Sequence, residues 1–494
     1  MSAQPAITST TETERKYEGA LPLPELAGAG EVRATRDAGA HRLNAVYYDT
    51  PGQRLAADGV TLRRRTGGSD EGWHLKLPLG GSAREEIRAP LADEPPAALL
   101  ALARSRIRHE PLGPVVTLAT DRRRRELLDA SGTVLAEVAV DTVSARRGEA
   151  TAEWTEVEVE LAPGADPAVL DAVEERLAAA GARPSASASK LARALAETAA
   201  AAAPEQPEPA AGTAGAEVLA YARGQLAALI RLDPAVRRDR HDSVHQMRVA
   251  TRRLRSCLRS YGRVLDRAAT RPVEDELRWL AGELGTARDR EVLADRLAAR
   301  LAELPAELRT GPVARRLARR DDTGRAAARE RVTAALDSSR YLALLDTLDL
   351  LLRGAPPLRR AAGRPAAKVL AGVVRREGDR LAGRLAVATE LPAGPDRDDA
   401  LHVARKAAKR ARYAAEAATP ALGGEARRRG RRWRRVQEVL GDHHDSVVAR
   451  EALAGLAAEA EAAGEPSFAY GVLWGREAEL AAAGERTLAT LRVR

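Results

Sequence analysis

The strongest constraint on the fold of this 494-residue chain is a helix pattern that occurs twice. The first copy carries five basic residues at intervals of three or four positions: His245, Arg248, Arg252, Arg255 and Arg259. The second copy repeats the spacing with four: His402, Arg405, Lys409 and Arg412. At about 100° per residue, such positions share one face of an α-helix, and small or apolar residues occupy the opposite face. A duplicated helix of this kind predicts a duplicated helical bundle.

A second matched segment follows each copy at nearly the same distance. It is Gly285 to Asp289 after the first copy and Gly441 to Asp445 after the second, and an apolar helical segment precedes both. A single basic stripe is often only a solvated surface. Two stripes in matched registers instead favour two faces that bind an anion.

The charge balance and the single cysteine limit the class of protein. Lys and Arg number 79 against 70 Asp and Glu, which favours a polyanionic partner. The lone Cys257 excludes an internal disulfide framework and suits a reducing compartment. The first residues lack the pattern of a signal peptide, and no long uncharged apolar run occurs. We therefore expect a cytoplasmic protein without a membrane span.

From the N-terminus to about Leu195 the pattern changes to the two-residue alternation of strands. Alternation occurs in residues 12–16, 60–65, 73–77, 115–126, 134–143 and 153–161. Helices are expected at 95–106 and 167–180. Many alternating strands with few long helices predict an antiparallel sheet or barrel.

Several of these strands carry charge along one face. On one strand Glu12, Glu14 and Lys16 share a face, and on another Val157 and Val159 separate three glutamates. Taken alone, each such face fits a strand exposed to water. If all of them faced inward, they would form a cage of cations beside carboxylates. A guanidinium group binds two phosphate oxygens at once, and Mg²⁺ or Mn²⁺ prefer carboxylate oxygens. The cage would therefore suit a metal-bound polyphosphate.

The segment Glu12 to Lys16 resembles the ExExK signature of the CYTH superfamily, also called the triphosphate tunnel metalloenzymes. Further segments match the family in the expected order: 47–50, 62–65, 73–76, 120–122, 136–141, 156–161 and 189–190. The resemblance covers residues 10–197. It implies an N-terminal antiparallel eight-stranded β tunnel barrel that hydrolyses triphosphates with a divalent metal, Mg²⁺ or Mn²⁺.

The resemblance also implies roles for individual residues. Acidic residues near the metal would be Glu12, Glu14, Asp141, Glu158 and Glu160. Catalytic residues that grip the phosphates would be Lys16, Arg63, Arg65, Lys76, Arg122, Arg124 and Lys190. A further acidic position matches Glu85 or Glu86, and the sequence does not choose between them.

Residues 198–213 are rich in Ala and Pro and are predicted to form a semi-extended linker. Helical patterns follow, with breaks expected near Pro234, Pro272, Pro305, Pro356-Pro357 and Pro392 to Pro395.

The motif His245 to Arg255 resembles that of the CHAD domain, and the copy from His402 to Tyr413 matches it with Lys406 and Lys409 in place of Val and Arg. The resemblance covers residues 214–490, with repeats at about 214–350 and 360–490. It implies all-α duplicated four-helix bundles that bind inorganic polyphosphate, and hence an association with polyphosphate granules. The whole chain is predicted to be α+β, a CYTH domain followed by a CHAD domain.

Two other ligands fit parts of the helical half, nucleic acid and a metal ion. Nucleic acid has a matching charge, but aromatic residues are only 3% of the chain and no nucleic-acid-binding motif occurs, so nucleic acid is disfavoured. The adjacent His443 and His444 suggest a metal site, but the first copy has Ala287 and Arg288 there. We therefore expect a loop or helix-cap role for these histidines.

The sequence thus predicts a triphosphatase, a divalent-metal-dependent phosphoanhydride hydrolase acting on inorganic tripolyphosphate or polyphosphate, joined to a polyphosphate-binding helical domain. Two alternatives stay open: a hydrolase or cyclase acting on an organic triphosphate such as ATP or thiamine triphosphate, and a non-catalytic polyphosphate-binding scaffold. The retained acidic residues argue against the scaffold. The oligomeric state is not indicated.

Overall fold

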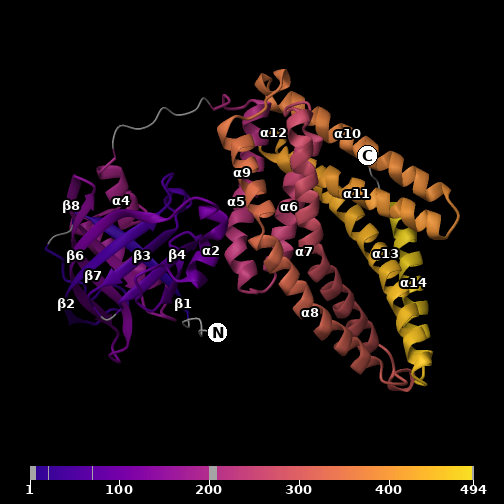
Figure 1. Cartoon of the computed structure of the whole chain (residues 1–494), viewed down its shortest axis with the longest axis horizontal. Coiled ribbons are helices and arrows are strands. Elements are labelled where there is room, and N and C mark those ends of the chain that lie inside the picture. Colours follow the sequence, from indigo (N-terminus) through magenta and orange to yellow (C-terminus); the bar gives the residue numbers. More distant parts are fainter. Residues whose placement is uncertain (1–6, 20–21, 69, 200–207, 492–494) are drawn as a thin grey trace. The chain divides into compact units, whose positions relative to one another are not determined.

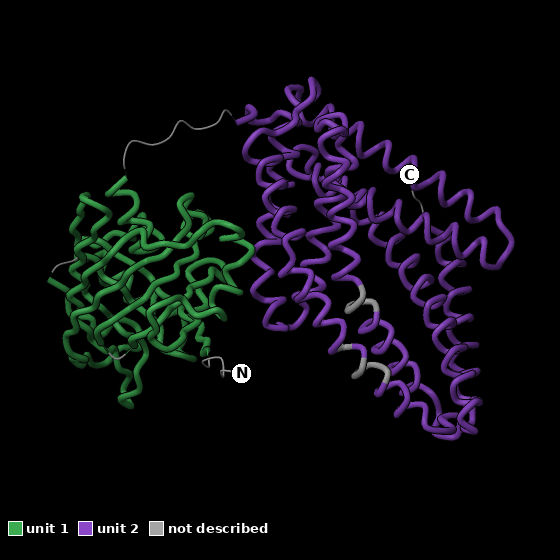
Figure 2. The backbone as a smooth tube through the Cα atoms, in the orientation of Figure 1, with its two compact units in different colours: residues 1–204 green, residues 205–494 purple. Residues whose placement is uncertain are grey.

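The computed structural model describes residues 7–19, 22–68, 70–199 and 208–491 (Figure 1). The chain forms two compact units, residues 1–204 and 205–494 (Figure 2). The first unit is built mainly of strands and the second of helices, which confirms the predicted fold class. Part of the predicted linker, residues 200–207, lies outside the described residues. None of the helices within the described ranges has the length and apolar character needed to cross a bilayer.

Eight antiparallel strands of the first unit close into a ring. The strands are β1 (Thr8–Glu18), β2 (Ala34–Asp49), β3 (Thr61–Thr66), β4 (Gly72–Gly80), β5 (Ala83–Ala89), β6 (Gly113–Leu128), β7 (Val134–Arg147) and β8 (Ala150–Leu161), with a short β9 (Arg183–Pro184) beside β1. They pair in the order β5-β4-β3-β2-β6-β7-β8-β1, and β1 also pairs with β5. Strand β1 closes the ring because Thr8 to Thr13 pair with β5 and Glu14 to Tyr17 pair with β8. The predicted tunnel is confirmed.

Four helices accompany the ring: α1 (Arg54–Ala57), α2 (Ala97–Ile107), α3 (Ala168–Ala179) and α4 (Lys190–Glu197). Strand residues such as Leu75 and Ile87 pack against α2, and Val157 and Val159 pack in the core that contains α3. The apolar side chains of these strands therefore point outward, under the helices. Because side chains alternate along a strand, the charged residues between them point into the ring.

Helix α4 closes part of the interior. Its Leu191 and Leu195 belong to the same core as Tyr47 and Leu118, which come from β2 and β6 and line the interior cavity. The apolar face of this short helix thus covers inward-facing residues of the ring. Its first residue, Lys190, is buried at the boundary between this apolar core and the charged interior.

The second unit contains two sets of four long helices. The first set is α5 (Ala214–Arg237), α6 (Ser243–Ser260), α7 (Arg267–Ala302) and α8 (Val313–Asp337), and the second is α10 (Ala366–Glu390), α11 (Pro395–Ala417), α13 (Gly424–Ala462) and α14 (Phe468–Thr490). The shorter helices α9 (Ser339–Asp349) and α12 (Thr419–Leu422) complete the unit. In each set, consecutive long helices pack against each other, as the duplicated pattern predicted (Figure 1).

Both sets share one apolar core, so the repeats are not separate bundles. This core takes residues from α5, α6 and α7 as well as α10, α11 and α13, and the repeated helices α6 and α11 pack directly. A smaller core joins the far ends of α7, α8, α13 and α14.

Helix breaks occur near Pro234 and Pro272 as expected, whereas the loop or cap role expected for His443 and His444 was wrong. The two prolines themselves lie inside α5 and α7, near the helix ends, where one missing backbone hydrogen bond is tolerated. His443 and His444 lie within the long helix α13, and not in a loop or cap. Their neighbours are therefore set by the packing of α13, which a local pattern does not reveal.

Candidate functional sites in the tunnel and the helical unit

The inward faces of the strands enclose a cavity of about 380 Å³, which we call the tunnel. Its basic lining residues are Lys16, Arg63, Arg65, Lys76, Arg84, Arg88, Arg122, Arg124 and Lys190. Its acidic lining residues are Glu12, Glu14, Asp70, Glu86, Glu137, Glu158 and Glu160. The structure thus brings together all seven predicted basic residues and four of the five predicted acidic ones. A cavity with both signs of charge suits an anion that arrives with a cation.

The predicted residue that does not line the tunnel is Asp141. Its side chain is fully buried, and its oxygens accept hydrogen bonds from Arg122 Nε at 2.8 Å and Arg122 Nη2 at 2.6 Å. Lys190 Nζ lies 2.8 Å from the same carboxylate. Asp141 therefore positions two cations of the tunnel wall.

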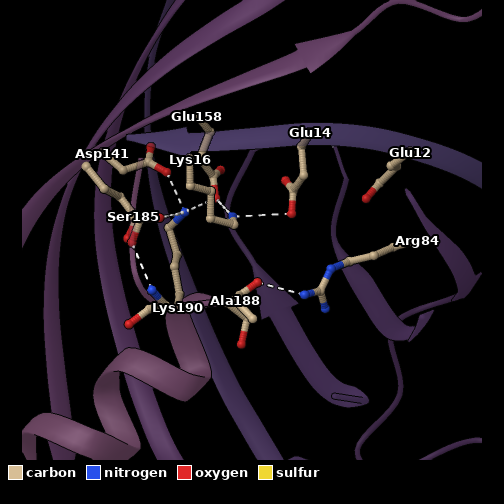
Figure 3. Close-up of polar contacts among 12 residues, drawn as sticks. Glu12, Glu14, Lys16, Arg84, Asp141, Glu158, Ser185, Ala188 and Lys190 are labelled. Atoms are coloured by element: carbon tan, nitrogen blue, oxygen red, sulfur yellow. Dashed lines mark hydrogen bonds and ion pairs between the residues drawn. The ribbon is translucent and has the colours of Figure 1, made fainter. Parts of the chain in front are cut away.

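Lys190 occupies the centre of a buried acidic cluster. Its Nζ lies 2.8 Å from Asp141 and 2.5 Å from Glu158 (Figure 3). Glu156 lies at 2.8 Å from the same nitrogen. Burial lowers its pKa, but these carboxylates outweigh burial and raise the pKa above its ordinary value. The cap residue Ser189 begins α4 by accepting a hydrogen bond from the backbone of Ala192. Among the described residues, this cluster could also accommodate a metal, but the ammonium already supplies its positive charge.

Strands β1 and β8 form the acidic wall of the tunnel. Their register pairs Glu14 with Glu160, and Lys16 with Glu158. Lys16 donates to Glu158 and lies 3.3 Å from Glu14 (Figure 3). Burial raises the pKa of Glu14, but the ammonium groups of Lys16, Lys76 and Lys190 together outweigh it, so the pKa is lowered overall.

Farther along this wall, the negative charges of the carboxylates are less fully balanced by nearby cations. Lys76 Nζ donates to Glu12 Oε2 at 2.5 Å, yet burial still leaves the pKa of Glu12 raised. Burial and the neighbouring Glu12 raise the pKa of Glu160 to about 7. Crowded carboxylates whose ionised forms repel one another would be stabilised by a further cation. Hard oxygen donors of this kind fit Mg²⁺ or Mn²⁺.

Strand β3 supplies guanidinium groups on the same interior. Arg63 Nη1 donates to the Tyr47 hydroxyl at 3.4 Å, and Arg65 Nη1 donates to Asp70 Oδ2 at 2.5 Å. Burial and the charge of Arg63 lower the pKa of Arg65 to about 10, so Arg65 stays charged at neutral pH. Several buried cations held this close repel one another, and a phosphate chain would offset that cost.

Strand β5 was missed from sequence, and it contributes three charged residues to the tunnel: Arg84, Glu86 and Arg88. Glu86 accepts from His74 Nδ1 at 2.9 Å and from Arg88, whereas Glu85 accepts from Ser9 Oγ at 2.6 Å. Glu86 is thus the glutamate that faces the tunnel. The available signal was the alternation of these charged residues with Ala83, Ile87 and Ala89, which Glu85 interrupts.

Arg84 links the tunnel wall to the segment before α4. Its Nη2 donates to the carbonyl oxygen of Ala188 at 2.7 Å (Figure 3). This contact helps to fix the approach to Lys190.

A second cavity of about 1030 Å³ lies among α6, α7, α11 and α13, and we call it the central cavity. Eight of the nine residues predicted to bind polyphosphate line it: His245, Arg248, Arg252, Arg255, Arg259, His402, Arg405 and Lys409. Further basic lining residues, which the repeat did not indicate, are Arg296, Lys406 and Arg410. Arg412 does not line the cavity; it donates to Gln437 Oε1 at 3.0 Å and stacks on Tyr413. The two repeated stripes therefore face one shared cavity.

The matched glycines of the repeat lie beside the repeated arginines. A Cβ atom on Gly285 would approach the Arg248 guanidinium to about 3.3 Å, and one on Gly441 would lie about 3.9 Å from Arg405 Nε. Thr286 to Asp289, the rest of the first matched segment, lie outside the residues whose side chains are described. Gly285 thus gives Arg248 room to lie against α7, whereas a side chain at Gly441 would meet Arg405 only at an ordinary contact distance.

The two histidines of α13 have different surroundings. His444 faces the central cavity, where its Nδ1 lies 3.1 Å from His402 Nδ1. His443 is buried, with Nε2 3.1 Å from Glu485 and 3.4 Å from Asp398. These two carboxylates also pair with Arg397 and Arg450, so the cluster joins helices by ion pairs.

The central cavity crowds cations together. Burial and the charges of Arg405, Arg252 and Arg248 lower the pKa of Lys409 to about 7. Burial and the charge of Lys406 likewise lower the pKa of His402. An anion in the cavity would offset this repulsion.

Comparison with known proteins gives matches to both units. Residues 10–195 match the family model described as CYTH domain, and residues 220–454 match that described as CHAD domain. The chain is similar to two uncharacterized proteins of Mycobacterium tuberculosis, strains CDC 1551 / Oshkosh and H37Rv. Each is 40% identical over 496 residues, covering 95% of this chain and 93% of the relative. A crystal structure of the CHAD domain from the plant Ricinus communis is 29% identical and covers 60% of this chain and 99% of its own, with a TM-score of 0.45.

Proposed function

Because this chain belongs to the family of proteins that join a CYTH domain to a CHAD domain, we propose that its first unit is a metal-dependent triphosphatase and its second unit binds inorganic polyphosphate. The observation that carries the proposal is the tunnel, in which an acidic wall faces buried Lys and Arg side chains. Such a site suits inorganic tripolyphosphate or the end of a longer chain.

The acidic wall would hold the metal, through Glu12, Glu14, Glu158 and Glu160. When bound, Mg²⁺ or Mn²⁺ would offset the charge of the phosphate oxygens and polarise the phosphoryl group that is attacked. The crowding that raises the pKa of Glu160 supports this placement, because a cation relieves it.

The basic residues would bind and orient the phosphate chain. Lys16 and Lys76 now pair with Glu158 and Glu12, and the same ammonium groups can donate to phosphate oxygens once a metal shares those carboxylates. Arg63 and Arg65 present planar donors that match phosphate geometry. Burial of these cations strengthens their attraction for the charge that develops during phosphoryl transfer.

An inorganic substrate fits the lining better than an organic triphosphate. Tyr47 and His41 are the aromatic residues among the described lining residues, and the Tyr47 hydroxyl already accepts from Arg63. A nucleobase would therefore find little stacking surface.

We expect Lys76→Ala and Arg65→Ala each to weaken the binding of a non-hydrolysable triphosphate analogue by about 10- to 150-fold, because each loses a charge-assisted contact of about 1.5 to 3 kcal/mol. Isothermal titration measures the affinity. Arg123→Ala is the matched control, since its exposed side chain lies on the outer face of β6. Unchanged affinity in both tunnel variants would contradict the assignment of these side chains to phosphate.

The central cavity supports polyphosphate binding by the second unit. A linear anion with one charge per phosphate needs a row of cations, and basic residues on one helix face lie about 5 to 6 Å apart. The stripes on α6 and α11 supply two such rows to one cavity. Acidic lining residues are fewer than basic ones: Glu438, Asp442 and Asp445.

Polyphosphate binding should weaken as the pH rises above about 7. Lys409 has a pKa of about 7 in the free protein, and a bound polyanion favours its charged form and so raises that pKa. Binding therefore takes up a proton above pH 7. We expect the affinity to fall about tenfold between about pH 7 and 8.5.

Lys409→Arg provides the control, because an arginine stays charged throughout this range and the cavity histidines are kept. Titration at several pH values should show a much flatter profile for this variant above pH 7. If the affinity of the variant fell as steeply above pH 7, Lys409 would be excluded as the cause of the pH dependence.

A further inference from the structure

A third cavity, of about 540 Å³, adjoins the central cavity on the side of α10, and we call it the arginine pocket. Its basic lining residues are Arg259, Arg263, Arg267, Arg376, Arg380, Arg384, Lys406 and Arg410. Glu377 is the acidic residue among its described lining residues. Eight basic residues around one carboxylate leave this pocket with an excess of positive charge.

The carboxylate of Glu377 already has two ion-pair partners. Glu377 is buried and accepts from Arg380 Nη1 at 2.7 Å and from Arg410 Nε at 2.8 Å. It therefore fixes two guanidinium groups side by side without neutralising the rest. Partial burial and the charge of Arg263 lower the pKa of Arg376, as expected where cations lie close together.

The arginine pocket is continuous with the central cavity. Arg259, Lys406 and Arg410 line both. Arg259 is the last basic residue of the stripe on α6, so that stripe leads from one cavity into the other. From there Arg376, Arg380 and Arg384 follow one face of α10 over about 12 Å, at 1.5 Å per residue.

The duplication does not account for the row on α10. The matching segments Ala216 to Ala220 of α5 and Ala367 to Ala371 of α10 align the two helices. In this alignment Gln225, Leu229 and Asp233 of α5 stand where α10 has its three arginines. The basic row is therefore particular to α10 and extends the shared cavity on one side only.

We propose that the arginine pocket continues the polyphosphate site of the central cavity, so that a long chain contacts both cavities and a short chain only one. This inference rests on the proposed polyphosphate binding by the second unit. Its consequence is selection by length: the affinity for long chains depends on α10, and the affinity for tripolyphosphate does not.

The test uses the full chain with a metal chelator, which prevents hydrolysis. The triple variant Arg376→Ser, Arg380→Ser and Arg384→Ser removes exposed side chains, so we expect it to fold, and its melting temperature checks this. The double variant Arg376→Ser, Arg384→Ser leaves both partners of Glu377 in place if the triple variant is unstable. Arg427→Ser, Arg428→Ser and Arg431→Ser, exposed on α13 outside both cavities, form the control with the same change of charge.

We expect the α10 variant to bind long-chain polyphosphate at least about tenfold more weakly, and tripolyphosphate with unchanged affinity and stoichiometry. The α13 control should lose less than about twofold for either ligand, as surface charges do. An equal loss in the control, or unchanged long-chain affinity in the α10 variant, would overturn the inference. The inference would also be overturned if the α10 variant bound one tripolyphosphate fewer per chain than the wild type, because the arginine pocket would then be a separate site for small anions. If the wild-type chain bound no long polyphosphate, the proposed function itself would fail, and the inference with it.

Discussion

Glu14→Gln should abolish metal-dependent hydrolysis while the protein stays folded. The change keeps the size of the side chain but removes a carboxylate from the acidic wall, and Lys16 keeps its partner Glu158. Losing several kcal/mol of charge stabilisation reduces the rate about 10³-fold. Phosphate release from tripolyphosphate with Mg²⁺ or Mn²⁺ measures the effect.

Glu153→Gln is the matched control, because Glu153 lies on β8 with the same chemistry but is exposed and bonds Ser144. Its activity should equal that of the wild type. Glu158→Gln should also be inactive. It also removes the negative charge that pairs with Lys16, Lys190 and Arg122, so its effect does not report on metal binding alone. Near-normal turnover in both tunnel variants would contradict the metal assignment.

Replacing Arg248, Arg252, Arg405 and Lys409 together with Glu should remove polyphosphate binding by the second unit. These residues come from both repeated helices and face the central cavity, so reversing their charge makes its centre repel an anion. With each lost contact worth about 1.5 to 3 kcal/mol, the affinity should fall more than about 10³-fold. Hydrolysis of tripolyphosphate by the tunnel should continue.

The control for this variant reverses four exposed arginines of α13 that line neither cavity: Arg427, Arg428, Arg431 and Arg435. It should keep most of the binding. Duplex DNA of equal charge tests specificity at about 0.15 M salt, where the Debye length is about 8 Å. If the wild-type chain bound DNA as tightly as polyphosphate, or if both variants lost binding equally, the helices would be a general polyanion surface.

The sequence predicted the tunnel wall well wherever charge alternated with apolar residues. On β8 the valines between the glutamates pack in an outer core beside α3, and this placement turns Glu158 and Glu160 inward. Strand β2 gave no such signal, because the charged and small residues from Ala34 to Arg42 are mostly exposed and the strand is held by pairing with β6. Long-range pairing of this kind leaves no local pattern.

Residue patterns alone could not distinguish the residues that line a cavity from neighbouring residues that do not reach it. Asp141 matched the family pattern, but it lies behind the tunnel wall as the partner of Arg122 and Lys190. Arg412 fits the spacing of the helix repeat, yet α11 is turned so that Lys406 and Arg410 face the cavity instead. The rotation of a helix about its axis depends on its packing partners, which for α11 are α10 and α13 and, over a smaller contact, α6.

The most direct measurement of the central claim is phosphate release by the full chain from tripolyphosphate, ATP and thiamine triphosphate, with Mg²⁺, with Mn²⁺ and with a chelator. We expect rapid release from tripolyphosphate with a divalent metal, much slower release from the two organic triphosphates, and none with the chelator. No metal-dependent release from any of the three would contradict the triphosphatase and leave a polyphosphate-binding scaffold. Faster turnover of ATP or thiamine triphosphate than of tripolyphosphate would contradict the inorganic substrate.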